Sequence, residues 1–312
     1  MTIPINEYKW AFIINPVAGN GKSIKVRKTL EKQLSLRDIK TKIIESEAPG
    51  HASELALQLA KQNYNPIIAV GGDGTLNEVA GALWDFPDIT LGIIPAGTGN
   101  DFSQILGMPE DFKQEHWDTF FEINSHKIDI GRCNGNMFFN GMGIGFDAQV
   151  AAENYTADGM VKQGNKGKYI WHIIKNLLFF KEDIMHLQGI NNKEKMPYFL
   201  STISIGRRYA GGFYLTPKAY GDDGLLDICI IEPINLWQRI NILLKVGKGE
   251  HLSHPKVNYH QTKNIFITLD HKTAFHIDGE LFFDDKFAIE ILPAQINFIY
   301  MPKGSHYLSN TK

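Results

Sequence analysis

The chain has 312 residues, of which 32 are Lys or Arg and 34 are Asp or Glu, for a net charge of −2 at pH 7. At about 150 residues per domain, this length predicts two domains. Charged residues make up 21% of the chain, which excludes a disordered polypeptide. The near-zero net charge gives no support for binding through phosphate attraction, so no nucleic-acid partner is expected.

Hydrophobic runs in the sequence are too short for a membrane-spanning helix. The most apolar window, residues 169–180, is interrupted by polar side chains and falls short of the about 20 residues that such a helix needs. The N-terminal residues lack the apolar region of a signal peptide. Cys133 and Cys229 are too few for a disulfide framework, so we expect a cytoplasmic protein with reduced thiols.

The first third of the chain alternates strand and helix patterns. Strands are predicted for residues 10–15, 42–45, 66–70 and 91–94, and helices for residues 23–34, 51–62 and 75–83. This alternation predicts βαβ units and a parallel sheet, in which ligands bind at the carboxyl ends of the strands. Glycine-rich segments at residues 19–21, 71–74 and 97–99 follow predicted strands, so we expect them at that edge.

The pattern changes near residue 126, after which strands dominate. Two predicted helices, at residues 168–180 and 236–246, interrupt the series. The strands are predicted at residues 128–133, 137–141, 198–205, 226–231, 264–269, 274–277 and 286–291. This succession predicts a second, β-rich domain of antiparallel strands.

The run Gly71-Gly72-Asp73-Gly74-Thr75 follows a strand and opens a helix. Its glycines allow backbone N–H groups to approach an anion, and the helix N-terminus adds a favourable dipole. An Asp in such a loop would repel phosphate unless a metal ion or water lies between them. The pattern therefore favours a nucleotide–Mg²⁺ site over a simple capped turn.

Two further segments carry similar signals. Residues 95–102, Pro-Ala-Gly-Thr-Gly-Asn-Asp-Phe, again combine a Gly-flanked Thr with an Asp at a helix start. Residues 15–23, Asn-Pro-Val-Ala-Gly-Asn-Gly-Lys-Ser, resemble the end of a Walker A motif, but Pro16 occupies the position of its first glycine. This segment is interpreted as a phosphate-side loop with Lys22 as a cation, or as a solvated turn.

Together, in this order, these segments resemble the diacylglycerol kinase catalytic-domain family, which includes sphingosine and ceramide kinases and small bacterial lipid kinases. NAD kinases are more distant relatives that share the GGDGT loop. Motifs at residues 139–147, 222–227 and 277–280 extend the resemblance over nearly the whole chain. The resemblance implies a nucleotide-binding α/β domain at residues 1–128 and about 296–312. It also implies a β-sandwich-like domain at about 129–295, with the active site between the two.

The resemblance also implies ATP as the phosphoryl donor. The residues that would surround the nucleotide are Asn15, Pro16, Gly19, Ser46, Gly71, Gly72, Asp73, Gly74, Thr75, Leu76, Asn77 and Thr98. Ser46 stands where the family usually has Thr, and either hydroxyl can donate a hydrogen bond. Family members commonly continue the Asn-Asp-Phe run with Ala-Arg, whereas Ser103 and Gln104 follow here, so no role of that arginine is carried over.

Carboxylates complete the implied site. Those that would hold catalytic Mg²⁺, partly through water, are Asp73, Asp101 and Asp129. The ligands of a second, structural metal would be Asp223 and the backbone carbonyls of Tyr220 and Leu225. Asp278 or Glu280 would accept the proton of the acceptor alcohol, and Asp278 is favoured. Strand alternation would point both of these carboxylates to the same side.

The implied reaction is transfer of the γ-phosphate of ATP to the hydroxyl of a membrane lipid, with diacylglycerol as the default acceptor and phosphatidic acid as the product. Phosphatidylglycerol, a sphingoid base and an undecaprenyl-like alcohol are alternative lipid acceptors, and NAD is a soluble alternative. A nucleotide- or lipid-binding regulator without turnover is a further alternative.

A lipid substrate implies peripheral contact with the inner face of the membrane. Residues 169–180 are rich in aromatic and aliphatic side chains and are flanked by lysines. They predict a helix that lines an acyl-chain cleft or contacts the membrane, or else a helix packed on the β-rich domain. The sequence leaves a homodimer open.

Overall fold

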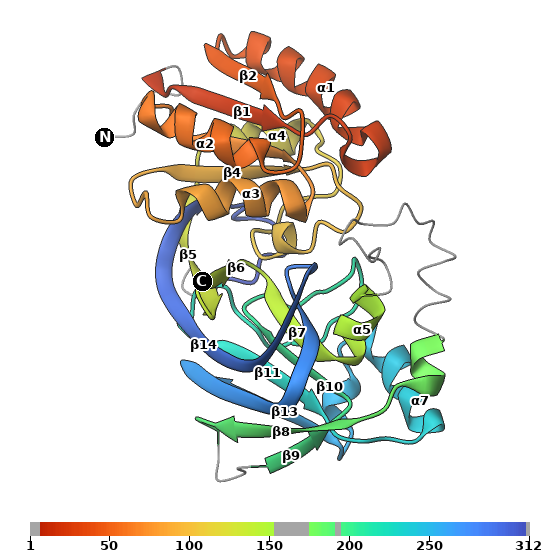
Figure 1. Cartoon of the computed structure of the whole chain (residues 1–312). Helices are drawn as coiled ribbons and strands as arrows, with labels where there is room; N and C mark the ends of the chain where they lie inside the picture. The colour runs from red at the N-terminus through yellow and green to blue at the C-terminus, as the bar shows by residue number, and fades with distance from the viewer. Residues whose placement is uncertain (1–6, 153–174, 191–194, 310–312) are drawn as a thin grey trace. The chain divides into compact units, whose positions relative to one another are not determined.

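The computed structural model describes residues 7–152, 175–190 and 195–309 (Figure 1). The chain divides into two compact units. The first contains Met1–Ile130, Tyr220–Gly224 and Leu292–Lys312, and the second contains Gly131–Ala219 and Leu225–Ile291. Tyr220–Gly224 therefore belong to the first unit, whereas the sequence interpretation placed them in the second.

The first unit is built on a parallel sheet in the order β14-β4-β3-β1-β2. Its strands are β1 (Trp10–Ile14), β2 (Thr41–Glu45), β3 (Ile67–Gly71), β4 (Thr90–Pro95) and the end of β14 (Glu280–Ile299). Strands β1 and β3 are buried along their whole length, as expected where helices cover both faces. The prediction of a parallel α/β domain is confirmed.

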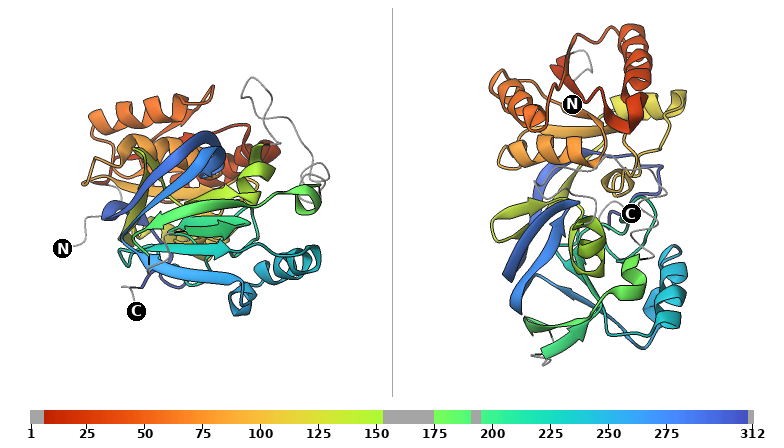
Figure 2. Two further views of the ribbon diagram at one scale, coloured as in Figure 1. Left: turned by 60° about the horizontal axis from the view of Figure 1, so that its bottom comes forward. Right: turned by 45° about the vertical axis from the view of Figure 1, so that its right-hand side comes forward.

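Helices α1 (Lys22–Leu36), α2 (His51–Lys61) and α3 (Asp73–Leu83) connect these strands at the predicted places. Figure 2 shows α2 and α3 on one face of the sheet and α1 on the other. The chain moves outward from β1 to β2 but in the opposite direction from β3 to β4. The ends of β1 and β3 therefore flank a switch point, where open α/β sheets bind their ligands.

Helix α4 (Gln114–Phe121) was not predicted. It carries an aromatic group into the core of the first unit, where Trp10 meets Phe120 and Phe121 at ring-centroid distances of 6.3 and 5.2 Å. At the other side of the sheet, Phe102 meets Phe298 of β14 at 5.0 Å. The apolar face of α4 is only eight residues long, which is short for recognition from periodicity.

The second unit is antiparallel, with the strand order β12-β11-β10-β7-β13-β14. Its strands are β6 (Asn136–Phe138), β7 (Gly141–Gly145), β8 (Asp183–Gln188), β9 (Lys195–Tyr198), β10 (Leu200–Ser204), β11 (Leu226–Ile231), β12 (Val257–Thr262) and β13 (Asn264–Ile277). Strand β5 (Ser125–Cys133) pairs with β6 and β14, while β8 pairs with β13 and β9. The prediction of a β-rich, antiparallel second domain is confirmed.

Several boundaries in this unit differ from the prediction. The predicted strand 198–205 corresponds to β10 and shares only Tyr198 with β9, and the predicted strands at 264–269 and 274–277 form one strand, β13. The register shift between Thr268 and Thr273 explains the apparent break in β13. Strands β8 and β12 and helix α5 (Phe146–Ala152) were not predicted. Strand β12 lies at the sheet edge and carries the polar sequence VNYHQT, which has no apolar alternation.

Helix α7 (Leu236–Val246) lies at the predicted residues and begins with a capping box. Asn235 accepts from the backbone N–H of Gln238 at 3.0 Å, and the Gln238 side chain accepts from the N–H of Asn235 at the same distance. Residues 175–179 are also helical, whereas 168–174 lie outside the described residues. Within the part of the chain that the structure describes, no helix combines the length and apolarity needed to cross a membrane.

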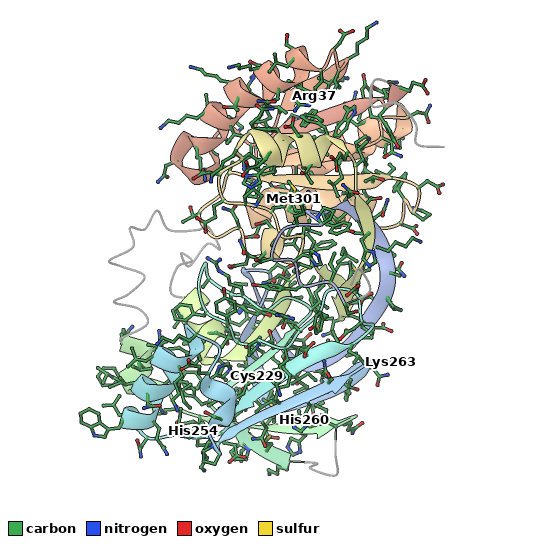
Figure 3. All side chains as sticks on the ribbon, turned by 180° about the vertical axis from the view of Figure 1, so that it is seen from behind. Arg37, Cys229, His254, His260, Lys263 and Met301 are labelled. Carbon is green, nitrogen blue, oxygen red and sulfur yellow. The ribbon has the colours of Figure 1, made fainter. Side chains whose placement is uncertain are left out.

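Both cysteines are free and buried. Cys229 lies on β11 inside the second unit (Figure 3). Burial raises the pKa of the Cys229 and Cys133 thiols to about 12, with nearby carboxylates adding to the effect. These thiols are therefore protonated core groups at neutral pH.

Candidate functional site

Three loops follow the strands of the first unit at their carboxyl ends. The first loop (residues 15–21) follows β1, the second loop (71–75) follows β3 and the third loop (95–102) follows β4. Ser46 follows β2, and its backbone N–H donates to the carbonyl of Ile14 at 2.9 Å. The structure therefore places the predicted nucleotide-binding residues of these loops at one edge of one sheet.

The first loop is fixed to both of its neighbours. The Asn15 side chain donates from Nδ2 to Thr75 Oγ1 at 3.1 Å, and its Oδ1 accepts from the backbone N–H of Val17 at 3.2 Å. Gly19 has a φ of +56°, and a Cβ atom there would lie 2.2 Å from the carbonyl oxygen of Ala96. Only glycine fits this contact with the third loop.

The second and third loops touch through their backbones. A Cβ atom on Gly97 would lie 2.3 Å from the Cα of Gly72, and the backbone N–H of Ala96 donates to the carbonyl of Gly71 at 2.7 Å. The Asn100 side chain accepts from the N–H of Gly97 at 2.9 Å and donates to its carbonyl at 3.1 Å. A side chain at either glycine would separate the loops, so the sequence pattern of two glycine-rich loops reflects close backbone approach.

Asp73 joins the first turn of α3 to the third loop. Its two carboxylate oxygens accept from the backbone N–H groups of Asp101 and Phe102, each at 3.1 Å. Desolvation raises the pKa of Asp73 above its ordinary value, against the lowering effect of these backbone hydrogen bonds. Asp101 itself is buried. Two of the predicted carboxylates therefore meet through one hydrogen bond between side chain and backbone.

The other predicted nucleotide residues differ in what they expose. Thr98 and Gly74 are exposed, Asn77 is half-buried, and Leu76 is fully buried with its N–H donating to the carbonyl of Gly72 at 3.1 Å. The carbonyl of Pro16 accepts from the Ser23 hydroxyl at 3.1 Å. The Leu76 side chain therefore packs on the buried face of α3 and is not available to a ligand at the surface.

Ser103 directly follows the Asn-Asp-Phe run of the third loop. Its hydroxyl donates to the carbonyl of Asn100 at 2.7 Å and is buried, so it fixes the end of the third loop. Lys22 does not remain with the loops: its amino group donates to the carbonyl of Glu110 and pairs with Asp111, both at 3.0 Å. In this structure the cation is therefore already partnered away from the glycine-rich segments.

Asp129 lies on β5 and holds a turn of the first unit. Its carboxylate accepts from the N–H groups of Gly224 and Ala294, each at 2.7 Å, while its own N–H donates to the carbonyl of Gly221 at 2.8 Å. Burial raises the pKa of Asp129 to about 6, the hydrogen bonds oppose this, and the charges of Asp223 and Asp222 add to the rise. Asp129 thus supports the turn that carries the predicted structural metal ligands.

Asp222 fixes the same turn from its other side. Its carboxylate accepts from the N–H of Ser309 at 2.6 Å and contacts Nε2 of His126 at 3.0 Å. The sequence interpretation assigned no role to Asp222 or His126. Their partners lie 87 and 96 residues away in the chain, a separation that leaves no local pattern.

In the second unit, the Asp278-Gly279 turn joins β13 to β14. Asp278 has a φ of +46°, and its carboxylate accepts from three backbone N–H groups, those of Phe139 at 2.7 Å, Asn140 at 3.0 Å and Gly141 at 2.8 Å. Strand alternation therefore does not apply to Asp278, which corrects the expectation that it and Glu280 project alike. Glu280 is the first residue of β14 and is exposed.

An Asp–His pair in the same unit joins the buried His276, two residues before this turn, to the half-buried Asp147. Nε2 of His276 contacts Oδ2 of Asp147 at 3.3 Å, and both side chains crowd Gly143 so closely that any Cβ there would clash. Asp147 belongs to the motif at residues 139–147, but His276 carried no signal in the sequence. The pair joins α5 to β13 and could be found only from the fold.

Two family profiles match the chain. The one described as "Diacylglycerol kinase catalytic domain" matches residues 9–133, and the one described as "YegS C-terminal NAD kinase beta sandwich-like domain" matches residues 140–300. A diacylglycerol kinase of Staphylococcus saprophyticus subsp. saprophyticus is 30% identical over 271 residues, covering 86% of this chain and 87% of that protein. A diacylglycerol kinase of Staphylococcus aureus strain MRSA252 is also 30% identical, covering 86% and 84%.

Solved structures show the same likeness. A Bacillus anthracis str. Sterne protein provisionally described as a diacylglycerol kinase superimposes with a TM-score of 0.75 at 25% identity, covering 94% of this chain and 95% of that one. A second structure from the same organism has a TM-score of 0.70 at 22% identity, covering 94% and 96%, and supports the fold.

These matches and the architecture define a phosphotransferase built from a nucleotide-binding α/β unit and a β-sandwich-like unit. The chain belongs to the diacylglycerol kinase catalytic-domain family, and it is a lipid kinase. Membership of a kinase family implies ATP as the phosphoryl donor.

Proposed function

We propose that the protein transfers the γ-phosphate of ATP to the free hydroxyl of diacylglycerol, forming phosphatidic acid and ADP. The names of the Staphylococcus relatives support this acceptor. The observation that carries the nucleotide half is the backbone contact between Gly72 and Gly97, with Asp73 bonded across it to the third loop. Glycine-rich loops at a switch point, beside a helix N-terminus, suit a phosphate chain.

On the nucleotide side, the N-terminus of α3 and the second loop present backbone N–H groups and the positive end of the helix dipole to the phosphates. Thr98 is exposed between two glycines and can donate a hydroxyl hydrogen bond. Asn15 and Ser46 lie at the ends of β1 and β2 and complete the polar edge. In this proposal, these groups orient the nucleotide, and Leu76 supports them from the core.

The donor set at Asp73 and Asp101 fits Mg²⁺. Both Asp73 oxygens accept a backbone hydrogen bond from the third loop, and a carboxylate oxygen has a second lone pair that can bind a cation. Among residues 7–152, 175–190 and 195–309, no three His, Cys, Asp or Glu side chains gather as a metal site, but Mg²⁺ commonly binds one or two carboxylates and completes its shell with phosphate and water. Bound there, the ion would neutralise the charge of the transferring phosphate.

Asp129 and Asp223 have a different place in the proposal. Asp129 supports the 221–224 turn through its hydrogen bonds, rather than joining Asp73 as a direct ligand. The charge of Asp223 raises the pKa of Asp129, so a cation held by Asp223 would relieve this repulsion. We propose such a structural cation at Asp223, with the carbonyls of Tyr220 and Leu225 as its further ligands.

On the acceptor side, we propose Glu280 as the group that takes the proton of the lipid hydroxyl. Asp278 already accepts three backbone N–H bonds, which leaves its carboxylate little capacity to accept a substrate proton. Glu280 is exposed two residues further on, at the start of β14, and its side chain forms no hydrogen bond or ion pair with the described residues. Asp278 then serves to position the turn that carries Glu280.

The test is incubation of the purified protein with γ-labelled ATP, Mg²⁺ and a total lipid extract, followed by identification of the labelled lipid. The proposal predicts label in phosphatidic acid and its loss in the Asp73→Asn variant. Label in phosphorylated phosphatidylglycerol or in a phosphorylated sphingoid base would show that this lipid, and not diacylglycerol, is the acceptor. Label only in NADP when NAD is supplied would overturn the lipid assignment, and ATP binding without transfer to any acceptor would indicate a regulator.

A further inference from the structure

The outer edge of the second unit brings together two segments that are distant in the sequence. Arg239 of α7 is buried and donates to the carbonyls of Leu177 at 2.6 Å and Phe180 at 3.2 Å, and it also pairs with Glu182. Its guanidinium lies 4.7 Å from the ring centre of Phe199. Helix α7 and residues 175–180 are thereby fixed side by side at the margin of this unit (Figures 1 and 3).

Both segments expose large apolar side chains. On α7, Trp237 is 80% exposed, Leu244 is 72% exposed, and Ile240 lies between them on the same stripe at i+3 and i+7 spacing. In the neighbouring segment, Phe179 is 75% exposed and Leu178 is 49% exposed. We name this set the docking face; its members are Leu178, Phe179, Leu236, Trp237, Ile240 and Leu244. Scattered apolar residues are normal on surfaces, but a group of six on adjoining segments marks an interaction site.

The rim of the docking face is positively charged. Lys175, Lys181 and Lys248 are exposed and Lys245 is half-buried, while α7 itself contains no acidic residue. Among the described acidic residues that flank the two segments in the sequence, Glu182 pairs with Arg239, Glu232 with Lys256 and Asp183 with His271, while Glu250 is exposed beyond the end of α7. Two copies of this face brought together would place lysines against lysines, which disfavours self-association. An anionic bilayer matches both the apolar centre and the cationic rim.

The docking face also continues into the apolar interior of its own unit. Phe180 lies 6.1 Å from Phe146 and 5.4 Å from Phe199 between ring centres, and Phe146 directly follows β7. The start of β7, Gly141, is one of the three donors to Asp278. Aromatic packing therefore links the docking face to β7, whose first residue donates to Asp278 in the Asp278-Gly279 turn.

We propose that the docking face inserts its aromatic and aliphatic side chains into the surface of an anionic lipid bilayer. Trp237 and Phe179 enter the boundary between headgroups and acyl chains, and the rim lysines contact the headgroups. This inference rests on the proposed function, because a long-chain lipid acceptor remains in its bilayer. It assigns the contact to α7, which the sequence interpretation read only as a helix, and to residues 178–179.

The test is co-sedimentation of the full chain with vesicles of phosphatidylcholine, with and without phosphatidylglycerol and without diacylglycerol. Wild-type protein should bind the anionic vesicles and bind neutral vesicles much more weakly. The Trp237→Ser/Leu244→Ser variant should bind anionic vesicles on the order of tenfold more weakly, since it loses two large apolar side chains from the bilayer. Lys181→Gln/Lys245→Gln should reduce the preference for phosphatidylglycerol.

Leu36→Ser is the matched control, because Leu36 is 66% exposed at the end of α1 in the first unit. It should bind vesicles as the wild type does. Thermal unfolding and phosphorylation of a dispersed short-chain diacylglycerol should be unchanged in all these variants. If the wild type fails to phosphorylate that short-chain lipid, the proposed function fails, and the vesicle binding is still read independently.

Three results would overturn the inference. In the first, the wild type fails to sediment with anionic vesicles. In the second, the Trp237→Ser/Leu244→Ser variant sediments as well as the wild type. In the third, light scattering finds a wild-type dimer that this variant converts to a monomer, which would make a second copy of the chain the occupant of the face.

Discussion

Asp73 in the first unit and Asp278 in the second both accept hydrogen bonds from backbone N–H groups of a loop distant in sequence. Asp73 accepts two, at the start of a helix and beside the glycine-rich loops. Asp278 itself lies in a left-handed turn between two strands, and its carboxylate accepts three such bonds. The comparison teaches that residue type alone does not decide the role of an acidic side chain. The groups that already bind its oxygens, and its exposure, decide how much capacity remains for chemistry.

The largest expected effect is the loss of activity when Glu280, rather than Asp278, is replaced. Glu280→Gln should lower kcat for lipid phosphorylation about 1000-fold, the range of a lost general base, with no change in thermal stability because the side chain is exposed. Steady-state kinetics and calorimetry would measure both quantities. Glu54→Gln, an exposed carboxylate on α2, is the control and should leave both unchanged. Retention of activity in Glu280→Gln would return the proton-accepting role to Asp278.

Replacing Asp278 should instead lower the stability of the fold. Asp278→Ala removes the acceptor of three N–H groups, each worth about 1 kcal/mol, so the free energy of unfolding should fall by about 3 kcal/mol in urea titrations. Asp278→Asn keeps one acceptor oxygen and a residue type that tolerates positive φ, so its loss should be smaller. Equal stability of Asp278→Ala and the wild type would mean that these hydrogen bonds do not position the turn.

Asp73 is proposed both to bind the metal ion and to hold the third loop, so its replacement should affect activity and stability together. Asp73→Asn retains one acceptor for the third loop but removes the charge, and we expect activity to fall about 100-fold, as for a lost electrostatic stabiliser. Unfolding should shift by about 1 kcal/mol or less. The activity should be followed across a Mg²⁺ titration. A variant with wild-type activity at every Mg²⁺ concentration would exclude Asp73 from the metal site.

The smallest expected effect concerns pH. The pKa of Asp129 is about 6 when folded, above its ordinary value, so the folded state binds this proton more tightly than the unfolded chain. Asp129 therefore favours folding at low pH, and this contribution is lost as the pH rises through about 6. In the absence of divalent cations, the stability of the wild type relative to Asp129→Asn should be greater at pH 5 than at pH 7.5. A difference that is constant with pH would contradict the raised pKa.

The first unit was largely predictable because each of its signals is local. Strands β1 and β3 are short apolar runs, and each is followed by one of the proposed nucleotide-binding loops. In the second unit the local signals are weaker: β12 was missed because its sequence is polar, and β13 was divided at its register shift. The partners of Asp278 lie 137 to 139 residues away. No local pattern in the sequence distinguishes the hydrogen-bonded carboxylate of Asp278 from the exposed carboxylate of Glu280.

The most direct test of the account compares ATP binding with phosphoryl transfer in the same protein. Titration calorimetry with ATP and Mg²⁺ should give the same affinity for the wild type and Glu280→Gln, because the nucleotide loops belong to the first unit. Transfer of label from γ-labelled ATP to diacylglycerol should be readily measured for the wild type and nearly lost in the variant. A wild-type protein that binds ATP but labels no diacylglycerol, or a Glu280→Gln variant that labels it at the wild-type rate, would contradict the account.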